Sequence, residues 1–209
     1  MAPETAGPCR RLADGATVIP ASRFIIRSTE YEGWLEARRG GVSATAVAAA
    51  ATPAGFRDVV DNWGAPVEVN DYMRFGSESE AELMRHAHQV HGIVPSDWLI
   101  AGEDPRHLAT PDGLSLDHRL IAECKTTGKD WATVPIKYRR QVQWQLHTTG
   151  AERCLFVWNL RVPDNHGWFY LGWMEPKTLW IDRDPDMIAD LTRTADELLE
   201  TLHGQLQPG

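Results

Sequence analysis

Apolar residues near the C-terminal end recur at the spacing of one helix face, which predicts an amphipathic helix over residues 185–203. A second helix is predicted over residues 135–149, where Val142 and Leu146 form a stripe that should face the core. A proline in its first turn and a glycine after its end support those bounds. Capping residues and an alanine-rich run predict the other helices, over residues 30–39, 43–51, 53–63 and 70–91.

Start and stop residues set the ends of these helices. The segment from Thr29 to Glu32 has the spacing of a capping box, so the first helix should begin at about residue 30. Ser43 is a natural N-cap for the alanine-rich helix. Gly92 is the expected C-cap of the helix over residues 70–91.

Short apolar runs predict the strands. The run CLFVWNL is typical of a buried strand, expected over residues 153–162, and a turn at 164–167 joins it to a return strand over 168–174. Upstream strands are predicted over residues 97–101, 106–109, 114–119 and 120–126. The order is helices, a three-stranded meander, a helix and further strands. It predicts an α/β fold with a mixed central sheet and helices on both faces.

Length and composition indicate one ordinary globular domain. The chain has 209 residues, 43% of them hydrophobic, and no apolar run approaches the roughly 20 residues that span a bilayer. Residues 1–22 mix Pro, Gly, Ala and Arg without periodicity, so we expect a loosely ordered arm there. Residues 23–209 should form a single domain.

Charge and cysteine content narrow the class of protein. A net charge of −8 argues against a protein that coats DNA through an overall basic surface. Local binding stays open, because residues 123–140 contain five basic side chains and two acidic ones. The three cysteines fit neither a zinc pattern nor a disulfide framework, and no secretory signal is visible, so a cytoplasmic location is expected.

Candidate chemistry is concentrated around Asp112, Glu123 and Lys125. Asp112 lies in a Pro-Asp-Gly turn, where Gly113 should permit a tight reversal. Side chains alternate along a strand, so Glu123 and Lys125 should share one face while Cys124 packs on the other. Two carboxylates can hold a hard divalent cation, and a lysine beside them can position a water. An Asp followed by Glu-x-Lys also arises by chance in chains of this length.

Three further groups of residues each have two readings. Arg38 with Ser43 and Thr45 stands at a helix start, which suits an anion or a plain capped turn. Tyr138, Gln141 and Gln145 share a helix face, which suits either phosphate and water binding or simple solvation. His86, His88 and His91 resemble a metal cluster at first sight, but they do not share a helix face well, so we interpret them as surface or interface residues. Gly76, one turn before Glu80 in a helix, suggests close approach to the sheet or to a nucleic acid.

These segments together resemble the phage-lambda-type exonucleases, or YqaJ-like viral recombinases, of the PD-(D/E)xK nuclease superfamily. The resemblance covers roughly residues 30–160 and preserves motif order. The matching motifs are Trp34-x-x-x-Arg38 with Gly41-Val42-Ser43-Ala44-Thr45, Gly76-x-x-x-Glu80, Thr110-Pro111-Asp112-Gly113-Leu114, Glu123-Cys124-Lys125 and Tyr138-x-x-Gln141-Val142-Gln143. Thr45 replaces the usual serine, and Thr110 replaces a serine or alanine; both side chains stay small.

The resemblance implies a restriction-endonuclease-like core and a metal site. Asp112, Glu123 and the carbonyl of Cys124 would hold a metal ion, and Glu80 would bind a second ion directly or through water. An oxygen-only ligand set favours one or two Mg²⁺ or Mn²⁺ ions over zinc. Lys125 would position or activate the attacking water.

The resemblance also implies the nucleic-acid contacts. Gln141 would orient the region of the nucleophile, and Tyr138 would pack or contact the backbone. Arg38, Ser43 and Thr45 would hold a terminal 5′-phosphate. Further implied DNA contacts are Lys137, Arg140 and Gln143.

The implied activity is 5′→3′ digestion of one strand of linear duplex DNA in recombination. Implied partners are duplex ends and a single-strand annealing protein, with a homo-oligomeric ring in several members and no membrane. Two other functions stay open on the residues: an endonuclease or single-strand nuclease of the same superfamily, and a non-catalytic module that binds DNA ends.

Overall fold

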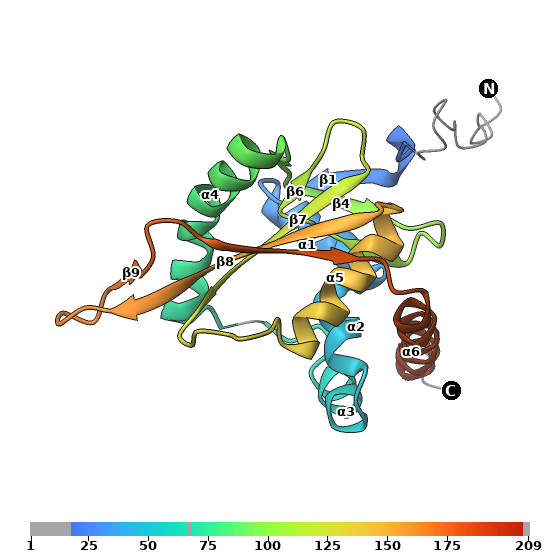
Figure 1. Ribbon diagram of the computed structural model, residues 1–209. Coiled ribbons are helices and arrows are strands. Elements are labelled where there is room, and N and C mark those ends of the chain that lie inside the picture. Colours follow the sequence, from blue (N-terminus) through green and yellow to red (C-terminus); the bar gives the residue numbers. More distant parts are fainter. Residues whose placement is uncertain (1–17, 67, 207–209) are drawn as a thin grey trace.

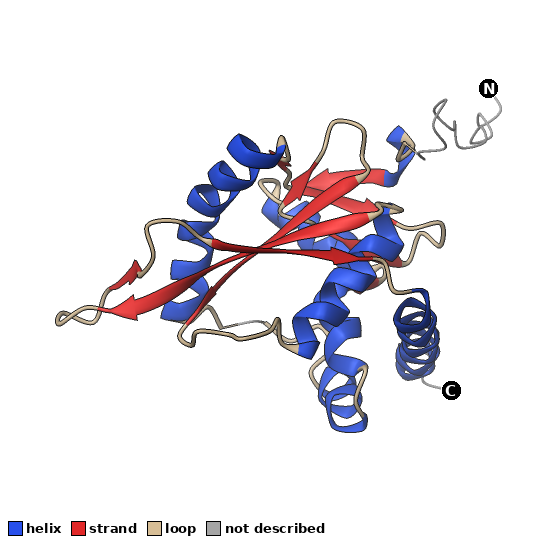
Figure 2. Cartoon of the chain, viewed as in Figure 1, coloured by secondary structure: helices blue, strands red, loops and turns tan. Residues whose placement is uncertain are grey.

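The computed structural model describes residues 18–66 and 68–206. A twisted mixed sheet lies at its centre, with helices on both faces (Figures 1 and 2). The sheet runs in the order β10 (Lys177–Asp182), β8 (Arg153–Pro163), β7 (Leu120–Thr127), β6 (Gly113–Leu114) and β3 (Val94–Pro95), and β9 (Phe169–Leu171) pairs with β8. β7 and β8 are parallel, and the other pairs are antiparallel. The predicted α/β class with a mixed central sheet is confirmed.

A smaller sheet brings distant parts of the chain together. Its order is β1 (Phe24–Arg27), β4 (Trp98–Ala101), β5 (His107–Ala109) and β2 (Val42–Ser43). β2 and β5 are parallel, with Ser43 opposite Leu108. Ser43 starts the alanine-rich helix and β5 leads directly to Asp112, so this pairing places the two ends of the candidate site in one region.

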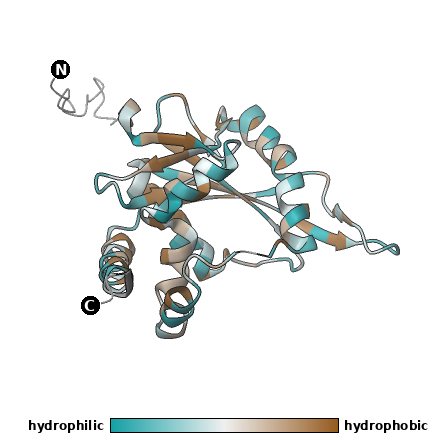
Figure 3. Cartoon of the chain, turned by 180° about the vertical axis from the view of Figure 1, so that it is seen from behind, coloured by the Kyte–Doolittle hydropathy of each residue, from teal (hydrophilic) through white to brown (hydrophobic). Residues whose placement is uncertain are grey.

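Six α-helices are present in the described residues, with a 3-10 turn at Ala21–Arg23 before β1. They are α1 (Tyr31–Arg39), α2 (Ala44–Ala50), α3 (Pro53–Asp61), α4 (Asp71–His91), α5 (Ile136–Thr149) and α6 (Pro185–Leu206). All six match predicted helices. Helices α4 and α6 mix hydrophobic and hydrophilic residues along their length, as one-sided packing requires (Figure 3).

The two faces of β7 pack against different helices. Ala122 and Cys124 belong to a buried cluster with Leu83 of α4. Ile121 belongs to another cluster with Val142 of α5. Alternation along the strand therefore assigns Glu123 and Lys125 to the α5 side, as predicted.

Helix α5 is also tied to α2 and α6. Trp144 is fully buried with Val47 and Leu191, and its Nε1 donates to the carbonyl of Leu108 over 3.1 Å. This bond fixes α5 relative to β5, the strand that leads to Asp112. Among the described residues, none of the helices has the length and apolar character needed to cross a bilayer.

Helix ends follow the predicted signals in most places. Ser43 accepts a hydrogen bond from the amide of Ala46 over 3.5 Å, and Gly92 ends α4 with φ of 68°. The prediction of a capping box at the start of α1 is wrong. Thr29 does not cap α1; its hydroxyl donates to Asp97 over 3.3 Å, so a distant carboxylate takes the hydroxyl.

The strand predictions need four corrections. Residues 114–119 do not form one strand: only Gly113 and Leu114 pair, and the chain then turns at His118, which has φ of 62°. The meander is split between sheets, because β5 pairs with β2 and β4 whereas β6 pairs with β7. Strand β10 was not predicted, because its residues are mostly exposed and lack an alternating apolar pattern. The return strand is shorter than predicted, covering only Phe169–Leu171.

The expected N-terminal arm falls mainly outside the described residues, since it covers residues 1–22 and the description begins at 18. Within the described part, Ile19 is 3% exposed and belongs to the main core cluster. Its amide donates to Nδ1 of His118 over 3.1 Å.

Candidate active site

Asp112 is held at the edge of β7 by backbone contacts. Its amide donates to the carbonyl of Ala122 over 3.1 Å, and its Oδ2 accepts from the amide of Cys124 over 2.6 Å. The neighbouring Gly113 was expected to allow a tight reversal, but its φ is not positive. Its real constraint is space: a Cβ there would lie 2.4 Å from Cε of Met84. The glycine therefore lets β6 press against α4, which places Asp112.

Glu123 is the most enclosed acidic group of the site, with 1% of its surface exposed. Its Oε1 forms an ion pair with Lys125 and accepts from Nε2 of Gln141 over 2.6 Å. Its Oε2 accepts from Nε2 of Gln145 over 2.6 Å. Strand alternation and the facing helix α5 together supply these donors, which compensate a buried charge.

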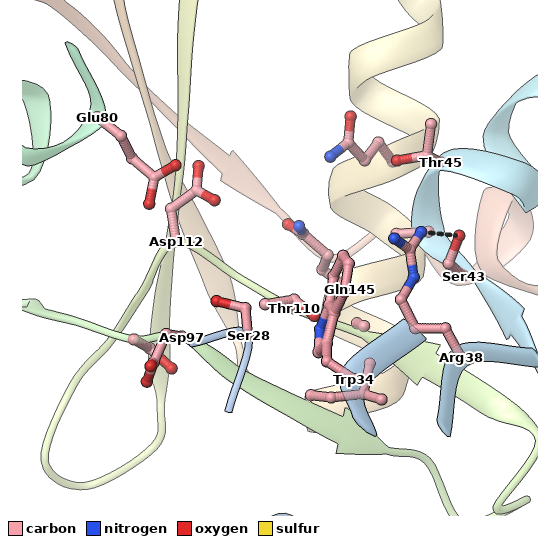
Figure 4. Close-up of a pocket in the computed structure, with 15 residues that line it drawn as sticks. Ser28, Trp34, Arg38, Ser43, Thr45, Glu80, Asp97, Thr110, Asp112 and Gln145 are labelled. Atoms are coloured by element: carbon pink, nitrogen blue, oxygen red, sulfur yellow. Dashed lines mark hydrogen bonds between the residues drawn. The ribbon is translucent and has the colours of Figure 1, made fainter. Parts of the chain in front are cut away.

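Glu80 approaches the same place from α4. It lines a cavity with Asp112, as Figure 4 shows. Gly76 precedes it by one turn and faces β7, because a Cβ there would lie 3.6 Å from Oγ1 of Thr126. That contact distance is ordinary, so the helix packs close to the strand at Gly76 without a clash.

The carboxylates of the site repel one another. Burial raises the pKa of Asp112 well above its usual value, and the charges of Glu123 and Glu80 raise it further. Burial and the charge of Glu123 also raise the pKa of Glu80. For Lys125 burial alone would lower the pKa, but Glu123 and Asp112 outweigh it and hold the pKa above its ordinary value. Only one lysine faces these three acids, so a bound cation would relieve the repulsion between them.

The donor set suits a hard cation. Asp112, Glu80 and Cys124 line one cavity, and the carboxylates with the Cys124 carbonyl would supply oxygen ligands there. Oε1 of Gln145 is buried without a hydrogen-bond partner among the described residues, and Gln145 lines the same cavity. A hydrated ion would satisfy such an acceptor. Across residues 18–66 and 68–206, no three His, Cys, Asp or Glu side chains form a ready-made ligand group, so backbone or water oxygens would have to complete the shell.

A cationic group lies at the other end of the cavity. The guanidinium of Arg38 stacks over Trp34, 4.3 Å from the ring centroid, and donates to Oγ of Ser43 over 3.1 Å. Burial lowers the pKa of Arg38. The turn before β2 is tight, because a Cβ at Gly41 would lie 2.1 Å from the carbonyl oxygen of Arg106. Arg38 and Ser43, which the sequence motif grouped together, are in contact in the structure.

One cavity of about 320 Å³ joins the two groups. Arg38, Ser43 and Thr45 line one end, and Glu80 and Asp112 line the other (Figure 4). Gln145 lies between the two groups (Figure 4), and Gln141 lines the same cavity. Residues from α1, α2, α4 and α5 thus meet at one site.

Other predicted DNA-binding residues lie around α5. Tyr138 is half-buried, with its ring 5.2 Å from that of Trp131. Nζ of Lys125 lies 5.7 Å from the centroid of the Tyr138 ring, and Nζ of Lys137 lies 4.6 Å from it. Lys137 is exposed and Arg140 half-buried, and neither lines the cavity that joins Arg38 to the acids.

Gln143 was predicted to contact DNA, and the structure contradicts this. It is 2% exposed, its Nε2 donates to the carbonyl of Asp182 over 2.8 Å, and its Oε1 accepts from the amide of Asp184 over 2.8 Å. Two helix positions correspond to roughly 200°, so Gln143 faces away from Gln141. Its amide ties α5 to the segment before α6.

The contact that the sequence analysis did not assign is the bond from Gln145 to Glu123. Gln145 was placed on the face of Gln141, with phosphate or water binding and simple solvation as its two readings, but a bond to Glu123 was not predicted. The spacing of four residues was the available signal.

The YqaJ-like viral recombinase domain matches residues 33–152. No curated protein matches the chain.

Solved structures match most of the chain. An alkaline exonuclease (LHK-Exo) from Laribacter hongkongensis is 26% identical, with a TM-score of 0.65 over 83% of this chain and 93% of that one. The same exonuclease in complex with dAMP is 25% identical, with a TM-score of 0.66 over 83% and 93%. A phage-related exonuclease from Haemophilus somnus 129PT, at 13% identity, has a TM-score of 0.63 over 79% and 95%, which shows the fold alone.

The fold is therefore that of the lambda-exonuclease-like nucleases, with a restriction-endonuclease-like core, as the resemblance implied. The domain match covers more than half of the sequence and includes the residues from Trp34 to Gln145 that build the site. The chain belongs to the YqaJ-like viral recombinase family.

Proposed function

We propose that this protein is a metal-dependent DNA exonuclease that digests one strand of linear duplex DNA from its 5′ end. The observation that carries this proposal is the single cavity joining Arg38, Ser43 and Thr45 to Glu80 and Asp112. A cationic group at one end and an acidic cluster at the other suit a terminal phosphate and a scissile phosphodiester of the same strand.

Similarity to an exonuclease supports the reaction class. LHK-Exo, at 26% identity, is described as an alkaline exonuclease, and its complex contains dAMP, a mononucleotide. Removal of single nucleotides from a strand end releases products of that kind. The same product is expected from a site whose phosphate anchor and acidic cluster lie in one small cavity.

The acidic cluster would hold one or two Mg²⁺ or Mn²⁺ ions through Asp112, Glu80, Glu123 and the carbonyl of Cys124. When bound, such ions polarise the scissile phosphate and lower the pKa of a water. Lys125 stays cationic and would orient that water or balance charge on the phosphate. Gln141 holds the Glu123 carboxylate in place through its hydrogen bond.

The anchor accounts for the polarity of digestion. Arg38 is stacked on Trp34 and bonded to Ser43, so its guanidinium is ordered before a substrate arrives. A 5′-phosphate offers a dianion at physiological pH, whereas a 3′-hydroxyl offers none. A strand should therefore bind with its 5′ end at Arg38 and its first internal phosphate at the acids.

The test measures DNA degradation in the presence of Mg²⁺. We expect rapid loss of linear duplex with a 5′-phosphate, slower loss without it, and no loss of closed circular DNA. A chelator should abolish activity, and Lys125→Ala should lower kcat by roughly 10²-fold or more. Equal rates on linear and closed circular DNA would favour an endonuclease. No degradation by the folded protein would favour a module that only binds DNA ends.

Membership of a recombinase family supports a role in DNA recombination. On that basis we propose a single-strand annealing protein as partner and a homo-oligomeric ring as the assembly. Light scattering of the purified protein tests the ring, since a monomeric mass at working concentration would contradict it.

A further inference from the structure

A second cavity lies beyond the acidic cluster. Its volume is about 430 Å³, and it shares Glu80 and Asp112 with the cavity that leads to Arg38. From the acids it continues past Lys125 to Tyr72 and Arg161. The cluster of carboxylates therefore has one cavity on each side, and each cavity contains an arginine.

Arg161 reaches this cavity from β8. Figure 1 shows the β8–β9 hairpin extending past α4. The Arg161 guanidinium lies 4.3 Å from the ring centroid of Tyr72 and 5.5 Å from that of Phe169. Phe169 contacts Tyr72 and Phe75 at 5.4 Å and 5.7 Å between centroids. The guanidinium is thus held on an aromatic platform made by α4 and β9.

The charge of Arg161 is available for a ligand. It has no carboxylate partner among the residues that the structure describes. The chain at Gly128 lies close to it, because a Cβ there would be 3.7 Å from a guanidinium nitrogen of Arg161. Tyr72, Met73 and Ser77 of α4 line the same cavity, and Tyr72 is 55% exposed.

The direction of the strand follows from the proposed function, on which this inference rests. With the 5′-phosphate at Arg38 and the scissile phosphate at the acids, the remaining strand must leave on the opposite side. That side is the cavity of Arg161. We propose that Arg161, positioned by Tyr72 and Phe169, binds the backbone phosphate that follows the scissile phosphate in the 3′ direction.

A purely structural role makes a different prediction. Arg161 also bridges the hairpin and α4 through its ring contacts, so its loss could simply loosen that region. A structural defect would lower activity on every substrate. A phosphate contact would depend on the charge of one particular linkage.

The experiment combines a protein change with a DNA change. The substrate is a 5′-phosphorylated duplex in which the linkage after the scissile phosphate is either normal or an uncharged methylphosphonate. For the wild type, the uncharged linkage should raise KM by roughly tenfold, as loss of a charge-assisted contact does. Arg161→Gln should raise KM on normal DNA by a similar factor. On the uncharged substrate the same variant should show no further increase.

Control variants and a control substrate separate a folding defect from the loss of a phosphate contact. Arg161→Lys keeps the charge and should recover part of the sensitivity to the uncharged linkage. Arg193→Gln, on the exposed surface of α6, should behave as the wild type. A methylphosphonate far from the 5′ end should leave KM unchanged in all of these proteins.

The experiment distinguishes failure of the Arg161 contact from failure of the proposed exonuclease function. If the wild type degrades DNA but the two changes multiply their effects on KM, Arg161 does not contact that phosphate and the inference is wrong. If Arg161→Gln unfolds, the comparison of Arg161→Lys with the wild type still decides. A smaller but measurable rise in KM with the uncharged linkage in Arg161→Lys supports the contact, whereas a rise equal to that of the wild type, or none in either protein, refutes it. If the wild type does not degrade linear DNA at all, the proposed function is wrong and the inference falls with it.

Discussion

Glu123 shows how single side chains organise the site. Each of its carboxylate oxygens accepts from one glutamine of α5, Gln141 on Oε1 and Gln145 on Oε2. Lys125 adds a charge on the first oxygen only. Oε2 therefore depends on Gln145 alone among the side-chain donors of the described residues, and this residue should matter as much as the motif residue Gln141.

The first prediction compares two buried glutamines of α5. Gln145→Leu should lower activity and apparent Mg²⁺ affinity by roughly 10–100-fold, because the supporting donor of an acidic residue is lost. Gln143→Leu should leave kcat nearly unchanged and lower the free energy of unfolding by about 1–3 kcal/mol, since it deletes bonds to Asp182 and Asp184. Mg²⁺ titrations of activity and urea unfolding of both variants measure this. The reverse pattern would show that the roles of the two glutamines are assigned wrongly.

Arg38 also belongs to this scale, and it supplies the second prediction. Arg38→Ala should reduce the preference for a 5′-phosphate by roughly 10–100-fold, because a charge-assisted contact disappears. The neighbouring Arg39 is exposed and pairs with Glu36, so Arg39→Ala should keep the preference. The measurement is the ratio of kcat/KM on phosphorylated and unphosphorylated duplex. An unchanged ratio in Arg38→Ala would place the phosphate elsewhere.

At the scale of elements, β6 and α4 approach each other unusually closely. Gly113 makes that approach possible, since a Cβ would meet Met84 at 2.4 Å, Ile93 at 2.9 Å and Ala122 at 3.1 Å. Asp112 precedes this contact, and Glu80 extends from α4, so the same packing sets the position of both acids.

The third prediction tests this packing. Gly113→Ala should lower the free energy of unfolding by about 1–3 kcal/mol, as overpacking of a core does, and should reduce activity by moving Asp112. Gly204→Ala in α6 is the control, because a Cβ there meets nothing within 4 Å and alanine favours a helix. Urea unfolding should show a loss for the first variant and no loss for the second. Equal stability of Gly113→Ala and the wild type would mean that α4 can move away at little cost.

At the scale of the whole molecule, a histidine pair connects the small sheet to α5. Nδ1 of His107 lies 3.1 Å from Nε2 of His147, so one ring donates and the other accepts. Burial lowers the pKa of both residues. Asp104 and Asp196 face His107 and raise its pKa in part, without cancelling the effect of burial.

The fourth prediction follows from the sign of these pKa shifts. An unfolded histidine has a pKa of about 6.5, and the folded pKa values are lower. The neutral pair therefore contributes its full stabilisation of the folded state above about pH 6.5. That stabilisation falls as the pH drops below this value. The raised pKa values of Asp112 and Glu80 act in the opposite direction, so a comparison between proteins is required.

The measurement is urea unfolding at about pH 8 and about pH 5.5, on either side of the unfolded histidine pKa. The wild type should lose more stability over this interval than His147→Gln, which retains only one of the two buried rings. The carboxylates are the same in both proteins and cancel. Equal losses would show that the pair titrates normally in the folded state.

Much of the fold follows from local sequence. Caps such as Ser43 and Gly92 act within a few residues, so they set helix ends correctly. Where a distant group competes, local reasoning fails: Asp97 takes the hydroxyl of Thr29, and the capping box does not form. The exposed strand β10 lacks an apolar pattern, because its stability comes from pairing with β8.

By itself, the sequence determined the helix order, the shared face of Glu123 and Lys125, and the motif order that identifies the family, because each depends on residue spacing along one chain. Only the tertiary structure decided which side chains meet across elements. Gln143 and Gln145 are equivalent as amides, yet one caps a distant segment and the other holds Glu123. Spacing defines the face of a helix, but the neighbour on that face depends on packing. For the same reason, the cavity that links Arg161 of β8 to Glu80 of α4 exists only in the folded chain.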